Sequence, residues 1–267
     1  MPDPHWHPTL LMRASIALHL LALVVVIAAP GHWPWALGAV AANHLLITAV
    51  SLWPRSNWLG PNWSRLPEAS ATRNEIALTI DDGPDPAVTP QVLDLLDRYA
   101  AQATFFCIGK QAARYPEVCR EIVRRGHAVE NHSQQHRHHF ALQGPRGLMR
   151  EVRAAQDTLT NVCGQHPLFF RAPAGFRNPF LDPVLVKLGL KLVSWSARGF
   201  DTRTGDTECV KTRLLRDLRA GAILLLHDGH AARTAAGIPV ILEVLPAVLE
   251  SAAAAGLRAV TLRQALS

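Results

Sequence analysis

The amino-acid sequence predicts an α/β fold: a parallel sheet that closes or nearly closes into a barrel, preceded by an N-terminal hydrophobic helical hairpin. Three observations support this prediction. From residue 74 onward, short apolar runs alternate with helical segments, polar residues follow five of the runs, and the first 54 residues contain only Asp3 and Arg13 as charged side chains. Such alternation is typical of a parallel sheet with crossover helices.

The composition is that of a folded protein with a large core. Of the 267 residues, 49% are hydrophobic and 18% are charged, which excludes a disordered chain, a collagen-like repeat and a disulfide miniprotein. The net charge of +6 comes from basic residues interspersed with acidic ones, so nucleic-acid binding is not expected. The four cysteines are too far apart for a CxxC site, and buried free thiols are their default interpretation.

The N-terminal region is expected to be a membrane anchor. No charged side chain occurs in residues 14–54, where a Pro-Gly break separates apolar runs at 14–29 and 35–53. The second run is long enough to cross a bilayer, which takes ~17–25 residues. The first run also fits a secretory signal sequence, and a buried helical hairpin is a third interpretation. Three tryptophans lie at the ends of the second run, where aromatic residues are enriched at the membrane–water interface: Trp33, Trp35 and Trp53.

The expected domain division is an anchor of one or two transmembrane helices at 1–54, a linker at 55–74 and a catalytic domain at 75–267. By the positive-inside rule, a membrane hairpin places both chain ends and the catalytic domain in the cytoplasm, whereas a single span places the domain outside. Both orientations stay open, in a membrane that would be the inner membrane of a bacterium. The arginines that bear on orientation are Arg13, Arg55, Arg65 and Arg73.

The alternating segments give a list of expected elements. The strands are 76–80, 104–108, 128–130, 169–171, 192–195, 222–226 and 259–261. The helices include 91–99, 116–125, 148–163, 179–188, 210–219 and 238–254. In the third of these helices, apolar residues recur on one face and form an inward stripe: Leu148, Val152, Leu159 and Val162.

Polar side chains lie just after five of the expected strands. In parallel α/β folds the active site gathers at the carboxyl ends of the strands. Each group alone has an ordinary explanation: a turn for Asp-Asp-Gly-Pro, an ion pair for Arg171, a capped strand end for His227. Together they predict a common site. The candidate residues are Asp81, Asp82, His132, His136, Arg171, Asp201 and His227.

His132 and His136 are four residues apart, a spacing that places both on one side of a helical turn, where they could converge on one ion. A histidine pair is by itself more often a surface or core feature. The Glu that a zinc-protease HExxH helix uses as its base is missing here, which disfavours that interpretation. His138 and His139 are expected to be exposed.

Five short sequence motifs occur in this order along the chain, and the ordered set is more specific than any one of them: LTIDDGPDP, NHSQQH, FFRAPAG, WSARGFD and ILLLHDG. They resemble the five motifs of the polysaccharide deacetylases, the NodB-homology domain of carbohydrate esterase family 4. The resemblance covers about residues 76–267 and implies a distorted (β/α) barrel of about seven strands, which agrees with the strands expected above.

The resemblance also implies a chemistry, the hydrolysis of an N-acyl group, foremost acetyl, from an amino sugar. Asp82, His132 and His136 would be ligands of a divalent metal, foremost Zn²⁺ with Co²⁺ as a second possibility. Asp81 would be the general base and His227 the general acid. Two further residues would support them: Arg171 would pair with the base, and Asp201 would hold the acid.

The backbone N–H of Ala174 would donate to the oxyanion of the reaction. Many members carry Tyr or Phe where this chain has Ala174, so an aromatic contact to the sugar could come from Phe176 or Trp195 instead. Trp195 could equally belong to the core.

The expected partner is an N-acylated amino-sugar polymer, oligosaccharide or glycolipid of the cell envelope, reached by an enzyme held at the membrane. One alternative is a deacylase or deformylase of a lipid-linked amino sugar at the cytoplasmic face. A second is a non-catalytic carbohydrate-binding module that retains the barrel. All the proposed base, acid and metal positions are present, which disfavours the binding module.

Overall fold

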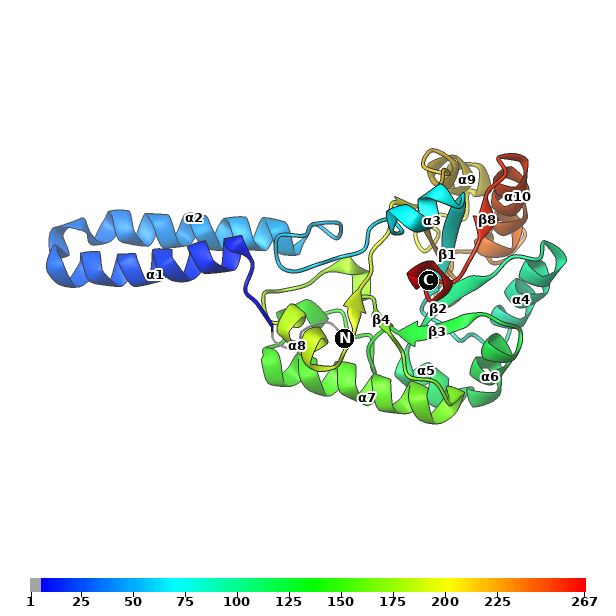
Figure 1. The fold of residues 1–267 in the computed structure, drawn as a ribbon, viewed down its shortest axis with the longest axis horizontal. Coiled ribbons are helices and arrows are strands. Elements are labelled where there is room, and N and C mark those ends of the chain that lie inside the picture. Colours follow the sequence, from blue (N-terminus) through cyan, green and yellow to red (C-terminus); the bar gives the residue numbers. More distant parts are fainter. Residues whose placement is uncertain (1–5) are drawn as a thin grey trace.

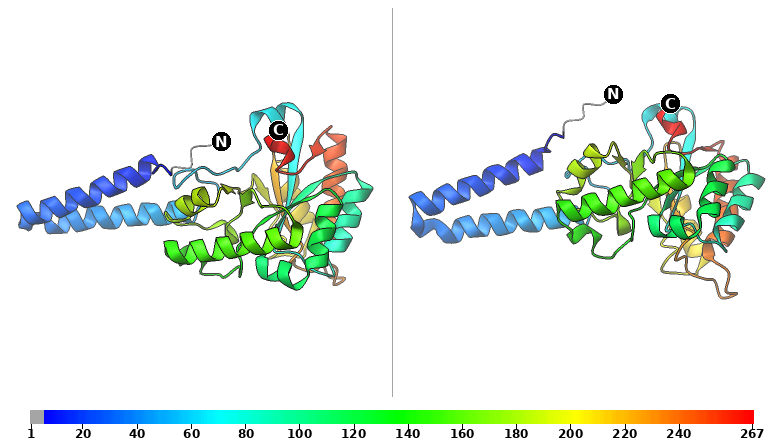
Figure 2. Two further views of the ribbon diagram at one scale, coloured as in Figure 1. Left: turned by 60° about the horizontal axis from the view of Figure 1, so that its bottom comes forward. Right: turned by 90° about the horizontal axis from the view of Figure 1, so that it is seen from below.

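The computed structural model describes residues 6–267, so residues 1–5 of the expected anchor lie outside the described residues. Two parts are visible in Figure 1: a barrel-like α/β domain, and a helical hairpin that extends away from it. The two further views in Figure 2 show the same projection of the hairpin from the domain.

The hairpin consists of α1 (Leu10–Ala28) and α2 (Trp33–Ser51), joined by the short 3₁₀ helix Pro30–His32. The helices lie side by side, and Asn43 Nδ2 donates to Ser15 Oγ at 2.8 Å across them. By length and composition, α1 and the segment 30–51 that contains α2 could each cross a membrane. Their apolar side chains lie largely exposed, so the domain does not supply an apolar cover for them.

The domain contains one sheet of parallel strands in the order β5-β4-β3-β2-β1-β7-β6, with β8 paired to β1. The bounds are β1 Glu75–Asp81, β2 Ala103–Cys107, β3 Ala128–Asn131, β4 Phe169–Phe170, β5 Lys191–Leu192, β6 Ala197–Arg198, β7 Ile223–His227 and β8 Arg258–Ala259. The edge strands β5 and β6 are separated by only four residues of chain. The sheet therefore curls round until its ends nearly meet, which confirms the predicted distorted barrel.

Helices cover the outside of this sheet. They are α3 Glu68–Thr72, α4 Thr89–Arg98, α5 Gly109–Arg114, α6 Pro116–Arg124, α7 Pro145–Cys163, α8 Leu181–Lys187, α9 Thr207–Leu215 and α10 Val240–Ala254, with short 3₁₀ helices at Phe140–Leu142, Pro173–Gly175 and Gln264–Leu266. All six expected helices are present, with ends shifted by up to three residues for five of them and by more than three at the end of α9. The structure adds α3 and α5, which are too short to leave a periodic apolar pattern.

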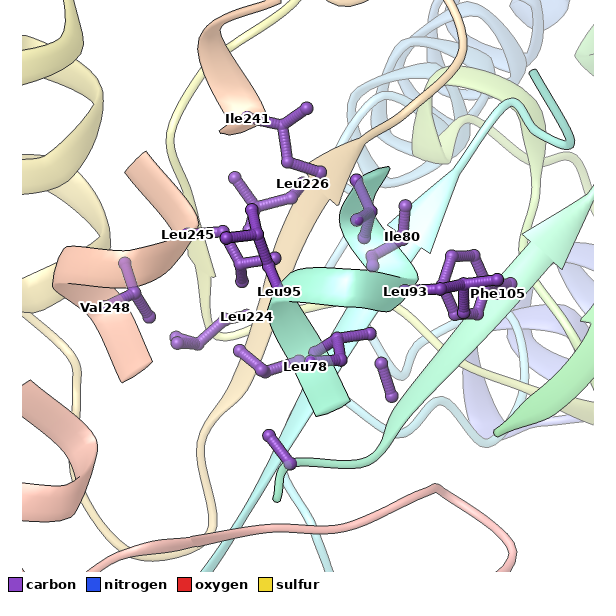
Figure 3. Packing of buried hydrophobic residues seen from close by; sticks show 14 of the residues in the cluster. Leu78, Ile80, Leu93, Leu95, Phe105, Leu224, Leu226, Ile241, Leu245 and Val248 are labelled. Carbon is purple, nitrogen blue, oxygen red and sulfur yellow. The ribbon is translucent and has the colours of Figure 1, made fainter. Parts of the chain in front are cut away.

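Side-chain alternation along the strands divides the core into two layers. On β1, Leu78 and Ile80 point outward and pack with residues of α4, α10 and β7, as Figure 3 shows. Alternate residues of a strand point to opposite faces, so Ala77 lies in the inner cluster. The inner face therefore also receives Thr79 and Asp81, at the end of the strand.

Residues 55–74, expected as a linker, pack closely on the barrel. Trp63 N–H donates to the Leu192 carbonyl and Ser194 N–H donates to the Trp63 carbonyl, so this segment pairs with the β5 edge. Leu59 and Leu66 are buried. The base of the hairpin is tied down as well, because Thr9 Oγ1 donates to the Trp58 carbonyl at 2.7 Å.

Candidate active site

The predicted site residues meet inside the barrel because of where their strands end. In the register of the sheet, Asp81 of β1 lies beside His227 of β7. Arg171 follows β4 and points inward in alternation with Phe170, whose side chain packs in the outer cluster under α7 and α8. Strand alternation thus brings a carboxylate, an imidazole and a guanidinium to the same end of the barrel.

Asp82, His132 and His136 form a cluster of three potential metal ligands, with one donor atom from each lying within 4.8 Å of the others. Asp82 Oδ1 is 3.3 Å from His132 Nε2 and 3.2 Å from His136 Nε2. Two imidazoles and one carboxylate are a ligand set used by catalytic zinc sites.

The protonation pattern of the cluster suits a cation. His132 Nδ1 lies 2.9 Å from the Arg171 carbonyl. A neutral ring that donates from Nδ1 to this carbonyl keeps a lone pair on Nε2, the nitrogen that faces Asp82. Among the described residues, Asp82 Oδ1 is buried without a hydrogen-bond donor. A buried carboxylate oxygen surrounded by imidazole nitrogens, with no hydrogen bond between them, fits a divalent metal well.

The ionisation states point the same way. Burial, reinforced by repulsion from His132, lowers the pKa of His136 to about 4, so this imidazole is neutral at pH 7. Burial opposes ionisation of Asp82, but the imidazoles of His132 and His230 outweigh it and hold the pKa of this carboxyl well below its usual range. Neutral imidazole and ionised carboxylate are the forms that bind metals.

The expected helical turn at the histidine pair is wrong. His132 and His136 lie in the loop after β3, and Ser133 and His136 have φ values of 64° and 49°, which a right-handed helix excludes. Ser133 Oγ accepts the His136 N–H at 3.1 Å, and Asn131 Oδ1 accepts the Ser133 N–H at 2.9 Å. Short polar side chains therefore fold this loop so that both rings reach Asp82.

Arg171 binds one of the two carboxylate oxygens of Asp81. Arg171 Nη1 donates to Asp81 Oδ1 at 2.7 Å and to Thr79 Oγ1 at 2.8 Å, and Nη2 donates to the Ser194 carbonyl at 2.8 Å. The guanidinium is fully buried and lies 4.2 Å from the ring centre of Phe106. The other carboxylate oxygen, Oδ2, faces the cluster of Asp82, His132 and His136 and lies 3.8 Å from His132 Nε2.

His227 is held by both oxygens of Asp201. Its Nδ1 lies 2.8 Å from Asp201 Oδ1, and its backbone N–H donates to Oδ2 at 2.7 Å. Burial lowers the pKa of His227, but the charge and hydrogen bond of the fully buried Asp201 outweigh that effect and the net pKa is raised. This arrangement fixes the ring and favours its protonated form, as a general acid requires.

A cavity of about 650 Å³ opens above these groups, and we call it the catalytic cavity. Asp81, Asp82, His132, His136 and His227 line it together with Ala174 and Trp195, whereas Phe176 lies outside it. Trp195 also packs in the inner cluster, so it serves the core and the cavity at once. Ala174 has a φ of 55°, a left-handed conformation that turns the chain along the cavity wall.

Two residues next to His227 support the site and were not singled out from the sequence. His230 Nδ1 lies 3.5 Å from Asp82 Oδ2, at the open side of the cavity. Asp228 is buried beneath the Asp82 loop, where its carboxylate accepts from Thr89 Oγ1 and from the Gly229 N–H. Burial raises the pKa of Asp228 to about 7. The HDG string that contains Asp228 was the available signal.

Gly229 is required by its contact with the backbone of a predicted metal ligand. A Cβ at this position would lie 2.3 Å from the Asp82 carbonyl oxygen. We expect Gly229→Ala to displace Asp82 and weaken Zn²⁺ binding about 10- to 100-fold, the range for disturbed support of a ligand. Competition with a chromophoric chelator measures this affinity. Gly144→Ala is the matched control, because a Cβ there meets nothing within 4 Å. Equal affinity in both variants would contradict the prediction.

Comparison with known proteins identifies the family. Residues 68–193 match the profile described as Polysaccharide deacetylase. A chitooligosaccharide deacetylase of Azorhizobium caulinodans is 39% identical over 166 residues, which cover 60% of this chain and 78% of that protein. A peptidoglycan-N-acetylglucosamine deacetylase of Bacillus cereus is 32% identical over 173 residues, 64% of this chain and 80% of that protein.

Solved structures agree with the barrel. A family 4 carbohydrate esterase from Streptomyces lividans, in complex with acetate, has a TM-score of 0.63 at 29% identity and covers 70% of this chain and 91% of its own. A family 4 pseudoenzyme from Bacillus anthracis has a TM-score of 0.65 at 18% identity. The match covers 73% of this chain and 66% of that protein, and it supports the fold alone. On the strength of its relatives, the chain belongs to the polysaccharide deacetylase family, the carbon–nitrogen hydrolases with a NodB-homology domain.

Proposed function

We propose that this protein is a metal-dependent deacetylase of an N-acetylated amino sugar and that the cluster at the barrel end is its catalytic centre. The observation that carries the proposal is the orphaned Asp82 Oδ1 facing two imidazole nitrogens, with Asp81 and His227 lining the same cavity. Relatives named as chitooligosaccharide and peptidoglycan-N-acetylglucosamine deacetylases support the substrate class.

Asp82, His132 and His136 would hold the metal, with Zn²⁺ as the first choice for this ligand set and Co²⁺ as a substitute. When bound, the metal would supply Lewis acidity to a water molecule and to the acyl carbonyl. Asp81 Oδ2 would accept the proton of the attacking water, while Arg171 keeps the carboxylate oriented through Oδ1. The ordinary pKa of an Asp is ~3.9, so orientation is the more useful contribution of Arg171.

His227 would donate a proton to the departing amine. Its Nδ1 is taken by Asp201, which leaves Nε2 for the substrate. The backbone N–H of Ala174 would donate to the oxyanion, and Trp195 would present its ring edge to the sugar, since Ala174 and Trp195 both line the catalytic cavity. Phe176 would act only on a substrate that extends beyond this cavity.

The raised pKa of His227 makes a prediction about pH. Because His227 must be protonated to donate, kcat is expected to fall as the pH rises through its pKa. Asp201 raises that pKa, so in Asp201→Asn the alkaline limb of the kcat–pH profile is expected to move to lower pH. Rates of acetate release across a pH series measure the limb. An unmoved limb would exclude His227 as the titrating acid.

The direct test is acetate release from N-acetylglucosamine oligomers by the full-length protein in detergent. We expect activity that EDTA removes and that Zn²⁺ or Co²⁺ restores. Chelator-resistant activity would refute the metal mechanism. A metal-loaded protein that releases no acetate from any N-acyl sugar would favour a non-catalytic carbohydrate-binding module.

The second part of the proposal concerns membrane attachment. We propose that residues 1–54 anchor the protein, with 75–267 as the catalytic domain and 55–74 connecting them. The exposed apolar faces of α1 and α2 support this. Arg13 and Arg55 lie near the domain end of the hairpin, and the intervening turn has neither Lys nor Arg, so the positive-inside rule favours the cytoplasm. Reporter fusions at the C-terminus test the orientation, and a periplasmic signal would overturn it.

A further inference from the structure

A second cavity of about 600 Å³ adjoins the catalytic cavity. The two share four lining residues: Ala174, Trp195, Arg198 and Arg203. The second cavity, which we call the arginine cavity, also reaches Leu52 and Trp53 at the end of α2. It thus lies between the proposed metal cluster and the domain end of the hairpin.

The arginine cavity is strongly basic. Five arginines line it, Arg55, Arg198, Arg203, Arg213 and Arg216. The one carboxylate in its wall, Asp217, is already bound by Arg65 at 2.7 Å and by Arg219 at 3.0 Å. Within residues 6–267, no ion pair joins any of the five to an acidic side chain. The positive charges in this cavity are therefore not neutralised by direct ion pairs.

Arg198 lies at the junction of the two cavities. Its guanidinium carbon is 5.3 Å from the ring centre of Trp195 and 5.0 Å from that of Phe200, which orients the group. Its Nε is buried and has no hydrogen-bond partner among the described residues. A buried donor without a partner is unfavourable, and planar guanidinium groups match the oxygens of a phosphoryl group.

We propose that the arginine cavity binds a phosphoryl group that joins the N-acylated amino sugar to a membrane lipid. This inference rests on the proposed deacetylase function and names its substrate class. The sugar would extend from the arginine cavity into the catalytic cavity, and the lipid chain would leave past Leu52 and Trp53 toward the hairpin. Water would hydrolyse the amide C–N bond, giving a carboxylate and an amine, and the phosphate ester would stay intact.

Three probes separate the contributions of phosphate and lipid. They are farnesyl phosphoryl N-acetylglucosamine, its neutral counterpart farnesyl N-acetylglucosaminide, and N-acetylglucosaminyl phosphate without a lipid. For the full-length protein in micelles we expect the first to bind about ten- to a hundredfold more tightly than the second, the range for hydrogen bonds to charged groups. It should also bind more tightly than the third, because the lipid chain adds apolar contact.

The variant Arg213→Gln/Arg216→Gln removes two charges that line only the arginine cavity. It is expected to abolish the preference for the phosphoryl probe. Arg98→Gln/Arg120→Gln, which removes two exposed charges outside both cavities, should keep it. Equal binding of the charged and neutral farnesyl probes, or a preference that survives the double variant, would overturn the proposal. If the soluble sugar phosphate binds as tightly as the lipid-linked form, the assignment of a lipid-linked substrate is wrong.

Acetate release distinguishes a failure of this inference from a failure of the function. Suppose that all variants deacetylate neutral chitooligosaccharides equally and that the phosphoryl probe binds no more tightly than its neutral counterpart. The proposed function then stands, the inference of a phosphoryl site is wrong, and the substrate is a polymer. If no substrate releases acetate, the proposed function fails. The equilibrium binding of the three probes still decides the inference in that case.

Discussion

Asp82→Ala is expected to release the bound metal and to reduce acetate release by about a thousandfold or more. Asp82 Oδ1 lies within 3.3 Å of both imidazole nitrogens, so its loss leaves two neutral ligands and no negative charge to hold a divalent cation. A metal supplies several kcal/mol of stabilisation to such a reaction, and each 1.36 kcal/mol is about tenfold in rate. Metal content and acetate release from the same preparation measure both effects.

The matched control for this variant is His139→Ala. His139 belongs to the same histidine-rich loop but is exposed and lines neither cavity. It should keep full metal content and activity. His132→Ala, by contrast, should behave like Asp82→Ala. An Asp82→Ala protein that retains one metal ion and wild-type activity would remove the cluster from the mechanism.

Asp81→Asn is expected to lower kcat by about 10²- to 10⁴-fold, the usual contribution of a general base, while the metal stays bound. The amide keeps the shape of the carboxylate and its carbonyl can still accept from Arg171, but it cannot take a proton from water. The contrast with Asp82→Ala is diagnostic, because adjacent aspartates then lose activity for different reasons. A kcat within tenfold of wild type, or a parallel loss of metal, would show that Asp81 is not the base.

The positions of the central site residues follow from strand alternation, which the sequence displays. Asp81 and His227 end strands whose apolar residues alternate between the outer and inner clusters. Motif order and strand ends were therefore sufficient to predict that these residues meet. The ligand set of Asp82, His132 and His136 also comes together as a cluster.

Local conformation was harder to predict than proximity. A spacing of four residues suggested a helical turn for the histidine pair, but hydrogen bonds from Asn131 and Ser133 side chains fold a loop instead. Of the expected strand at 192–195 only Leu192 belongs to a strand, β5, and β6 begins two residues beyond the expected end, because the chain bends where the two edges of the sheet approach each other. Both outcomes depend on tertiary contacts that a short window of sequence does not contain.

The arginine cavity also could not be predicted from a short window of sequence, because it is built from segments that are far apart in the chain. Its lining comes from the residues just after α2, from the segment around β6 and from the C-terminal end of α9 with the residues that follow it. The sequence shows these arginines as scattered charges, most of them between acidic residues. Only the fold reveals that they gather beside Trp195, next to the domain end of the hairpin, where within residues 6–267 none of them forms an ion pair with a carboxylate.

The most direct test of the central claim is a Co²⁺ titration of the metal-free full-length protein, with visible absorption and acetate release followed together. Three protein ligands predict a low-coordinate cobalt spectrum that rises to one equivalent, with activity rising in parallel. Asp82→Ala and His132→Ala should show neither change. Full acetate release before any Co²⁺ is added, or a spectrum that survives in both variants, would contradict the account.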